Sequence, residues 1–167
     1  MGSEMCIRDR NKISSIAQVD KSMLMQSTDG IAENESENQS VSMIVPKAPE
    51  NMGDYIDLVS AENGSNLEVK SGSVIITQKL AKLLDLKTGD TITIKLSGHE
   101  EKEFKIGGVS KNYALHYIYI TPDDFESVYG EKPVYNLSFI DLKKDTDENS
   151  FKEQLISNDE FYGISFK

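Results

Sequence analysis

The sequence predicts an α+β fold, a mixed sheet with helices packed on it, together with a small β-rich lobe. In residues 72–96 the spacing of apolar residues changes from helical to alternating, which indicates an amphipathic helix followed by a half-buried strand. From residue 117 the apolar segments follow the order strand, helix, strand, helix, strand, which favours helices on a mixed sheet. We therefore place the β-rich lobe at about 67–109 and an α/β lobe at about 117–167 together with 11–60.

The first ten residues, MGSEMCIRDR, differ in composition from the rest of the chain. They contain both arginines and the single cysteine, and beyond Arg10 every basic residue other than histidine is lysine. The segment GSEMCIRDR resembles the in-frame translation of a transposon-end adapter used in preparing sequencing libraries. We therefore expect residues 1–10 to be non-native and exclude them from the fold prediction. A natural flexible N-terminus is the alternative interpretation.

The part that follows predicts strands, a loop and a helical turn. Residues 13–26 alternate imperfectly and are expected to contribute a strand around 22–27, and a second strand is expected at 41–45. The stretch 29–39 between them is polar and acidic, and it is expected to be an exposed loop or hairpin tip. A helical turn is expected over 51–59 and a short strand over 67–69.

The central stretch predicts a strand, a helix, a turn and a second strand. The β-branched run 74–76 is expected to be a strand, and Thr77 stands where the hydroxyl of a helix N-cap would accept a hydrogen bond from a free backbone N–H. The helix should bury four residues at helical spacing: Leu80, Ala81, Leu83 and Leu84. After a turn at 87–90, alternation over 91–96 predicts a strand with one buried face.

A hairpin and a short strand should come next. Residues 102–109 alternate and should pair with 91–96, and the pair Gly107-Gly108 suggests a bulge or a close backbone approach. A further strand is expected at 117–120.

A second helix is expected directly after this strand. Thr121 supplies the N-cap, Pro122 suits the first helical position, and acidic residues follow at the positive end of the helix dipole. Gly130 should end the helix. Its buried face should consist of Phe125, Val128 and Tyr129.

The C-terminal part predicts a strand at 136–142, a helix at 150–157 and a last strand at 161–166. Before this helix, three side chains have the spacing of a calcium-binding loop: Asp145, Asp147 and Asn149. Ser150 stands where the loop needs glycine and Ile156 where it needs a bidentate glutamate, so we predict no metal site. The acidic side chains should instead cap the N-terminus of the helix.

The composition excludes several classes of function. The formal net charge is -10, so the chain repels phosphate backbones and we predict no nucleic-acid partner. The single cysteine, Cys6, lies in the first ten residues, so the native part has neither a disulfide framework nor a thiolate metal site. No window of the sequence approaches the roughly 20 consecutive apolar residues that a membrane helix needs.

The chain offers little for catalysis. His99 lies in a polar turn, where we expect a solvated side chain, and His116 lies at the entrance to a strand, where we expect a hydrogen-bonded structural imidazole. No sequence pattern for a nucleophile triad, a zinc protease or a phosphate-binding loop is present. We therefore predict no enzyme, no catalytic residue, no cofactor and no metal. A hydrolase that uses His116 with a nearby aspartate or serine is an alternative.

Two long stretches and one dipeptide carry a family resemblance. They are VIITQKLAKLLDLKTGDTITI at 74–94, GGVSKNYALHYIYITPDDFESVYG at 107–130, and Tyr135-Asn136. Together they resemble the extracytoplasmic domain of FtsX-like ABC transporter permeases, the group that includes the MacB-type core domain. The first is similar to that family's strand, helix and L-x-x-GD segment, and the second to its NY-x-x-HY-x-Y-x-(S/T)-P segment and short helix. The resemblance covers most of 40–166.

The resemblance implies a domain on the outer face of the cell membrane that takes part in ATP-driven export without making bonds itself. Its expected partners are the rest of the permease with its transmembrane helices, a cytoplasmic ABC ATPase subunit, and a second copy of the permease or a second permease chain. Because no membrane helix is present, we expect a truncated gene whose native part begins at Asn11, and a fragment that is itself soluble. The alternative is a free-standing secreted or surface-anchored binding module without catalysis.

The same region is rich in tyrosine: Tyr113, Tyr117, Tyr119, Tyr129 and Tyr135. These are either amphipathic sheet residues with phenol groups at the rim or an aromatic contact patch for a partner. Together with the family motif, they give five candidate structural or partner-contact residues: Asn112, Tyr113, His116, Tyr117 and Tyr119.

Overall fold

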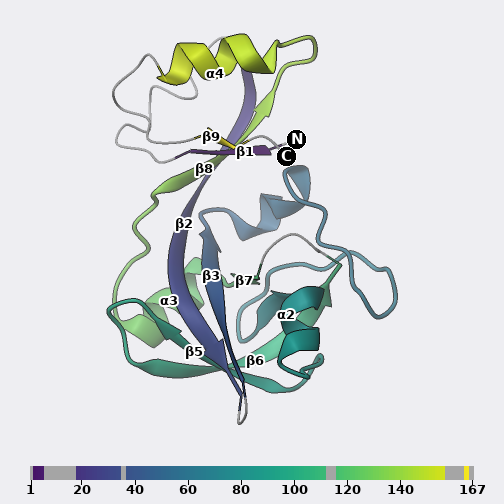
Figure 1. Ribbon diagram of the computed structural model, residues 1–167, viewed down its shortest axis with the longest axis vertical. Coiled ribbons are helices and arrows are strands. Elements are labelled where there is room, and N and C mark those ends of the chain that lie inside the picture. The colour runs from purple at the N-terminus through teal and green to yellow at the C-terminus, as the bar shows by residue number, and fades with distance from the viewer. Residues whose placement is uncertain (1, 6–17, 35–36, 112–115, 157–163, 166–167) are drawn as a thin grey trace.

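The computed structural model describes residues 2–5, 18–34, 37–111, 116–156 and 164–165 (Figure 1). Its strands are β1 (Gly2–Met5), β2 (Val19–Glu33), β3 (Asn38–Pro46), β4 (Val74–Thr77), β5 (Thr91–Leu96), β6 (Glu101–Ser110), β7 (Tyr117–Tyr119), β8 (Leu137–Leu142) and β9 (Ile164–Ser165). Its helices are the 3₁₀ helix η1 (Pro49–Asp54) and the α-helices α2 (Gln78–Leu83), α3 (Pro122–Tyr129) and α4 (Glu148–Ile156). A mixed sheet with helices packed on it confirms the predicted α+β class.

Six of the strands form a closed ring. The nine described strands follow the order β3-β7-β4-β6-β5-β2-β8-β1-β9, and β3 also pairs with β2. Because β2 is bonded to β3 along one edge and to β5 along the other, the strands β2, β3, β7, β4, β6 and β5 close on one another. A closed ring leaves none of these strands with a free edge in the described structure.

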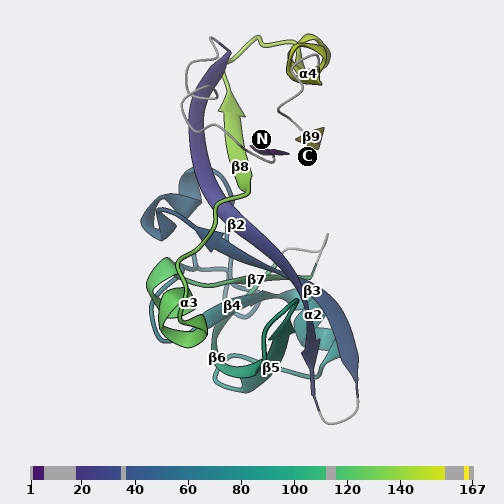
Figure 2. The ribbon, with the colours of Figure 1, turned by 90° about the vertical axis from the view of Figure 1, so that its left-hand side faces the viewer.

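Strand β2 belongs to two parts of the sheet. Its C-terminal part, from Met25 onward, pairs with β3 in the ring, whereas Val19 to Met25 pair with β8 outside it. Figures 1 and 2 show β2 running the length of the molecule, with α2 and α3 against the ring and α4 at the opposite end beside β8 and β1. This part outside the ring, made of β8, β1, β9 and α4 with the start of β2, is called the outer sheet below.

The segment from residue 67 to residue 109 supplies β4, β5 and β6. These strands are hydrogen-bonded to β2 and β7, which the sequence analysis places in the other lobe. Residues 2–5, which we expect to be non-native, are paired with β8 as strand β1. The predicted boundaries between segments therefore fall within one continuous sheet.

The stretch 29–39, expected to be an exposed loop or hairpin tip, lies at the end of the β2–β3 hairpin, but most of it is strand. β2 continues to Glu33 and β3 begins at Asn38, so only a short tip separates them. Two small residues explain why this polar stretch is a strand. Ala32 is buried inside the ring, and Gly30 lies so close to β5 that an added Cβ would be 2.7 Å from the backbone oxygen of Lys95.

Two other expectations about local structure are corrected. Residues 67–69 do not form a strand, and the one bridge nearby joins Val59 to Asn66. Thr77 occupies the N-cap of α2, but its hydroxyl makes no capping hydrogen bond and is buried at the end of β4.

Helix α2 buries a narrower face than the sequence predicts. Leu80, Ala81 and Leu84 are buried against the ring, but Leu83 is 40% exposed. The helix has only six residues, so a single stripe centred on Leu80 and Leu84 meets the core and Leu83 falls at its margin.

Most other local predictions are confirmed. The hairpin of β5 and β6 has the predicted alternation, and the β4–β6 register shifts between Val74 and Ile75, opposite Gly107. A Cβ on Gly107 would overlap the side chain of Ser73, which explains why this position is glycine. At α3, the hydroxyl of Thr121 accepts from the backbone N–H of Asp124, and Gly130 ends the helix.

The core has two parts. The first lies inside the ring and under α2 and α3, and it contains Ile76, Leu80, Ile94 and Phe125 among others. The second covers the outer face of β3, β7 and β4 and extends to the outer sheet through Phe139. Strands β3, β4 and β7 are therefore buried on both faces, because successive side chains point to opposite faces and each face meets one of the two cores.

Helix α4 begins at Glu148, two residues before the predicted start, and an acidic side chain caps it as the sequence predicts. The Asp147 carboxylate accepts from the Ser150 hydroxyl at 2.7 Å and from the backbone N–H of Asn149 at 3.2 Å. These hydrogen bonds, the one from Ser150 first, lower the pKa of Asp147 from its ordinary value of 3.8. Its role as a helix cap is confirmed, and α4 buries Phe151 beneath it.

Asp147→Ala is expected to lower the melting temperature of α4 at neutral pH, because the helix loses its first-turn acceptor. The pKa of Asp147 is lowered by folding, so its contribution is complete above the ordinary value and disappears as the pH falls through the folded value. The two proteins should therefore converge in acid when melting is followed by circular dichroism. Asp147→Asn, which keeps the acceptor without the charge, should retain most of the stability, and equal losses in both variants would contradict the capping role.

Candidate functional site

The junction between the ring and the outer sheet is the candidate functional site. Two chain segments cross it: β2, and the connection from α3 to β8, residues 130–136. Hydrogen bonds at Glu131, Val134 and Asn136 attach the connection to the ring. The outer sheet is therefore coupled to the ring through β2, through these attachments and through the packing of Phe139 in the second core.

Asn136 makes the attachment nearest to β8. Its side-chain oxygen accepts from the backbone N–H of Ser27 at 2.8 Å, and its side-chain nitrogen donates to the backbone oxygen of Ser27 at 2.9 Å. Its backbone N–H donates to the oxygen of Met25 at 3.1 Å. The amide of Asn136 therefore takes the place of a neighbouring strand beside β2 where β8 has not yet begun.

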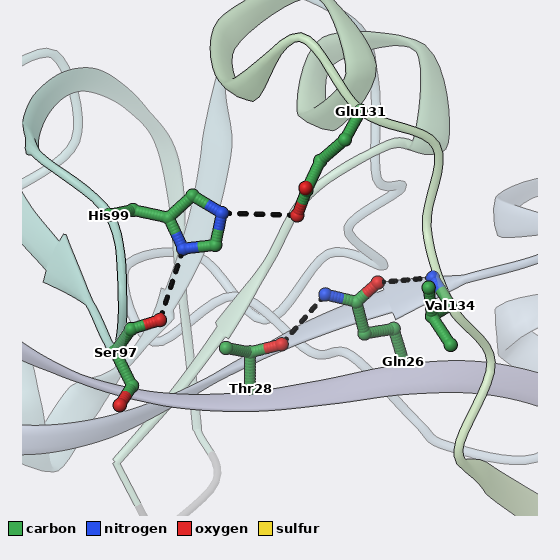
Figure 3. A network of polar contacts seen from close by, with 6 residues as sticks. All are labelled: Gln26, Thr28, Ser97, His99, Glu131 and Val134. Carbon is green, nitrogen blue, oxygen red and sulfur yellow. Dashed lines mark hydrogen bonds and ion pairs between the residues drawn. The ribbon is translucent and has the colours of Figure 1, made fainter.

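Gln26 makes the second attachment from a buried position on β2. Its side-chain oxygen accepts from the backbone N–H of Val134 at 2.6 Å, and its side-chain nitrogen donates to the Thr28 hydroxyl at 2.7 Å (Figure 3). Both ends of the amide are thus hydrogen-bonded, as a buried polar side chain requires.

His99 makes the third attachment, and its prediction as a solvated side chain is wrong. Its side chain is 25% exposed, with Nδ1 3.1 Å from the backbone oxygen of Ser97 and Nε2 3.0 Å from the Glu131 carboxylate (Figure 3). Its ring lies edge-on to Tyr129, with centroids 4.9 Å apart. Burial raises the pKa of Tyr129 to about 12, so this phenol stays neutral beside the imidazole.

The apolar side of the junction contains two of the predicted residues. Tyr117 and Tyr119 are 6% and 0% exposed and pack in the second core with Met23, Met25 and Phe139. Their rings meet edge to face, with centroids 6.1 Å apart. Because both side chains lie in the core, neither presents its ring at the surface.

His116 is hydrogen-bonded, as the sequence analysis expects. Its Nδ1 lies 3.0 Å from the backbone oxygen of Ser40, which joins the start of β7 to β3. The partner that the described residues provide for this ring is therefore a backbone oxygen. Asn112 and Tyr113 lie outside the described residues.

Other parts of the described surface give weaker candidates for a functional site than the junction does. A hollow of about 160 Å³ lies between α3 and the β4–β6 pair, with Asp124 and Phe104 among its lining residues, and one of about 260 Å³ lies beside α2. The described residues contain no group of three or more histidine, cysteine, aspartate or glutamate side chains that could hold a metal ion. None of the helices in the described ranges has the length and apolar character needed to span a bilayer.

The sequence analysis did not predict that Gln26, His99 and Asn136 take part in attaching the α3–β8 connection to the ring. Each is a polar residue in an unremarkable setting, and the partners of Gln26 and Asn136 lie more than a hundred residues away in the chain. One signal was available, because Asn136 stands in the Tyr135-Asn136 pair that contributes to the family resemblance. The long-range pairing itself has no signature in one sequence.

Known structures match the fold of this chain over almost its whole length. The periplasmic region of MacB from Actinobacillus actinomycetemcomitans matches 98% of this chain and 87% of its own, with a TM-score of 0.55 and 13% identity. The extracellular domain of the noncanonic ABC-type transporter YknZ from Gram-positive bacteria matches 99% of both chains, with a TM-score of 0.57 and 14% identity. The chain has the fold of these transporter domains.

This transporter-domain fold is not restricted to proteins described as transporters. A protein from Bacillus anthracis described as a lipoprotein matches 99% of this chain and 96% of its own, with a TM-score of 0.50 and 11% identity. No protein-family model and no curated protein sequence matches the chain. The chain therefore shares its fold with proteins whose sequence identity to it is too low to reveal the similarity.

Asn136→Ala is expected to lower the free energy of unfolding by about 1–2 kcal/mol, because it removes two side-chain hydrogen bonds and leaves the backbone groups of Ser27 without them. Urea unfolding at equilibrium measures this loss. Asn63→Ala is a matched control, since the Asn63 side-chain oxygen bonds only within its own turn, to Ser65. A cost for Asn136→Ala no larger than that of the control would show that the attachment does not stabilise the junction.

Proposed function

We propose that this chain is an extracytoplasmic domain of an FtsX-like ABC transporter permease. In that role it engages a substrate or partner outside the membrane and couples mechanically to ATP-driven export. It catalyses no reaction. Its partners are the transmembrane part of the permease, a cytoplasmic ABC ATPase subunit, and a second copy of the permease or a second permease chain.

The observation that carries this proposal is the match to two transporter domains over almost the whole of both chains. A match of 99% in each direction with the YknZ domain means that the likeness extends to both the ring and the outer sheet. The sequence motifs at 74–94 and 107–130 point to the same group of permeases. They fall on ring strands and on the helices α2 and α3 that pack against the ring.

The junction supports the mechanical part of the proposal. β2 is a single strand of 15 residues that contributes to both the ring and the outer sheet. A displacement of the outer sheet is therefore transmitted to the ring through this strand. Asn136, Gln26 and His99 then hold the second crossing segment to the ring.

The proposal is tested on the complete gene. Sequencing the locus on both sides should show hydrophobic helices before and after this domain and an ABC ATPase gene nearby. The complete product, expressed with the tagged ATPase, should fractionate with membranes and copurify with the ATPase in detergent. A complete reading frame without membrane helices, or an ATPase that elutes alone, would contradict the proposal.

A free-standing secreted or surface-anchored binding module is the second candidate function. The match to the Bacillus anthracis protein described as a lipoprotein favours it. This alternative requires a signal peptide upstream and a stop codon after Lys167, so the same sequencing experiment distinguishes the two candidates.

A further inference from the structure

Strand β1 fills an interior position of the outer sheet, between β8 and β9 (Figure 1). Its pairing with β8 is antiparallel and runs from Gly2 opposite Asp141 to Met5 opposite Ser138. Its other edge pairs with β9, which is bonded to no other strand in the described structure. β1 therefore covers the edge of β8 that β2 leaves free, and it holds β9 in the sheet.

This interior position is taken by residues that we expect to be non-native. Residues 1–10 contain both arginines and the single cysteine of the chain, and they resemble a translated adapter. Pairing between strands uses backbone N–H and C=O groups, which every residue other than proline supplies. An extended segment of a different sequence can therefore pair with β8 in the same way.

We propose that the edge of β8 opposite β2 is a strand-acceptor site. Its occupant in the intact protein is the native chain segment that precedes Asn11, and residues 2–5 take the place of that segment in the present chain. The site recognises the backbone of an extended segment that runs antiparallel to β8, which is how a sheet edge generally accepts an added strand.

The residues of β8 that face β1 show why a strand is needed there. Ser138, Phe139 and Ile140 are 0%, 2% and 0% exposed. Buried backbone N–H and C=O groups need a hydrogen-bond partner within the protein, because water does not reach them. Without a strand beside β8, these groups on its second edge would lose their partners and β9 would be detached.

The direction of the strands favours a segment of the same chain as the occupant. β1 and β2 are both antiparallel to β8, so they run parallel to each other with β8 between them. A connection between parallel strands of one sheet needs about a dozen residues or more. Residues 11–18 lead directly into β2 and supply part of such a connection, so the segment upstream of them can reach the site.

A natural domain with the same fold supports a strand at this position. The match with the YknZ domain covers 99% of this chain, which leaves about two of its 167 residues outside. Most of β1 therefore lies within the matched region.

This inference goes beyond the proposed function and holds for both candidate functions. In either case the chain would pass through the middle of the outer sheet before it enters β2. In a permease, that strand would join the preceding membrane part to the outer sheet, and this consequence alone rests on the proposed function.

Amide hydrogen exchange of the full chain, followed by NMR, tests whether β8 accepts the strand. Glu4 lies opposite Phe139, and Glu4→Pro removes its backbone N–H, so exchange at residues 138–141 should be faster by about tenfold or more. Glu4→Ala keeps the N–H and should exchange like the unmodified chain. Unchanged exchange in β4 would show that the ring is folded in both variants. Equal exchange of β8 in the two variants would overturn the proposal.

Restoring the upstream segment tests the identity of the occupant. Residues 1–10 are replaced by the residues that the intact gene encodes between Asn11 and any preceding membrane helix or signal peptide. A run of these residues should become protected from exchange, and β8 should exchange no faster than in the present chain at any protein concentration. Protection of β8 that appears only at high concentration would show that a second copy fills the site. That result, unprotected upstream residues, or an intact gene that itself encodes MGSEMCIRDR would overturn the proposal.

Discussion

Leu80→Asp is expected to unfold the ring. Leu80 is fully buried where α2 meets the ring, and it belongs to the first core with Ile76 and Ile94. A carboxylate there would lose its hydration without gaining a partner, which costs several kcal/mol against a total stability of about 5–15 kcal/mol. We expect the variant to lack a cooperative thermal transition by circular dichroism and to show a collapsed ¹H–¹⁵N correlation spectrum.

Leu83→Asp is the matched control for this prediction. The two leucines lie three residues apart on the same helix, but Leu83 is 40% exposed, so its carboxylate would remain in water. This variant should fold and melt within a few degrees of the unmodified chain, because surface substitutions usually change stability by about 0.5 kcal/mol or less. If Leu83→Asp unfolded the protein and Leu80→Asp did not, α2 would have to be rotated about its axis.

Gly30→Ala is expected to cost about 2–3 kcal/mol, although it adds a single methyl group. The added Cβ would lie 2.7 Å from the backbone oxygen of Lys95 and 3.1 Å from the Cα of Leu96. These are backbone atoms of β5, so they can move only if the β2–β5 pairing itself shifts. Urea unfolding should show a lower midpoint, and hydrogen exchange should show weaker protection in β5.

Gly53→Ala provides the comparison. Gly53 lies in η1, where an added Cβ would have nothing within 4 Å, so the same chemical change should be close to neutral there. A cost at position 30 as small as that at position 53 would show that β2 and β5 are not as close as the pairing requires.

The elements predicted well from the sequence are those whose signals are local. Helix α3 is an example, since Thr121, Pro122 and Gly130 mark its two ends within nine residues and Phe125 marks its buried face. The β5–β6 hairpin is another, because alternation and the turn between the strands agree. In both cases the residues that specify the element are the residues within it.

The features that the sequence did not predict depend on distant partners. Residues 29–33 look like a loop because they are polar, but their pairing with β3 and β5 makes them a strand. Leu83 has the pattern of a buried residue, yet the width of the contact with the ring decides its exposure. Closure of the ring depends on β7 pairing with both β3 and β4, which no local pattern describes.

The candidate site was the least predictable part for the same reason. His99 lies in a turn that is polar like many others, and only the folded chain brings Glu131 to within 3.0 Å of its ring. The tyrosines stand out in the sequence either as structural residues of the sheet or as contacts for a partner. Tyr117 and Tyr119 are buried in the second core, in keeping with the structural alternative.

The length of β2 has a consequence for how force would pass through the molecule. Backbone hydrogen bonds in an antiparallel pair lie across the strands, so a pull along β2 loads its bonds to β3, β5 and β8 in shear and all together. A pull on the outer sheet perpendicular to β2 would instead break the β2–β8 hydrogen bonds one after another. The domain therefore resists force along β2 more strongly than force perpendicular to it.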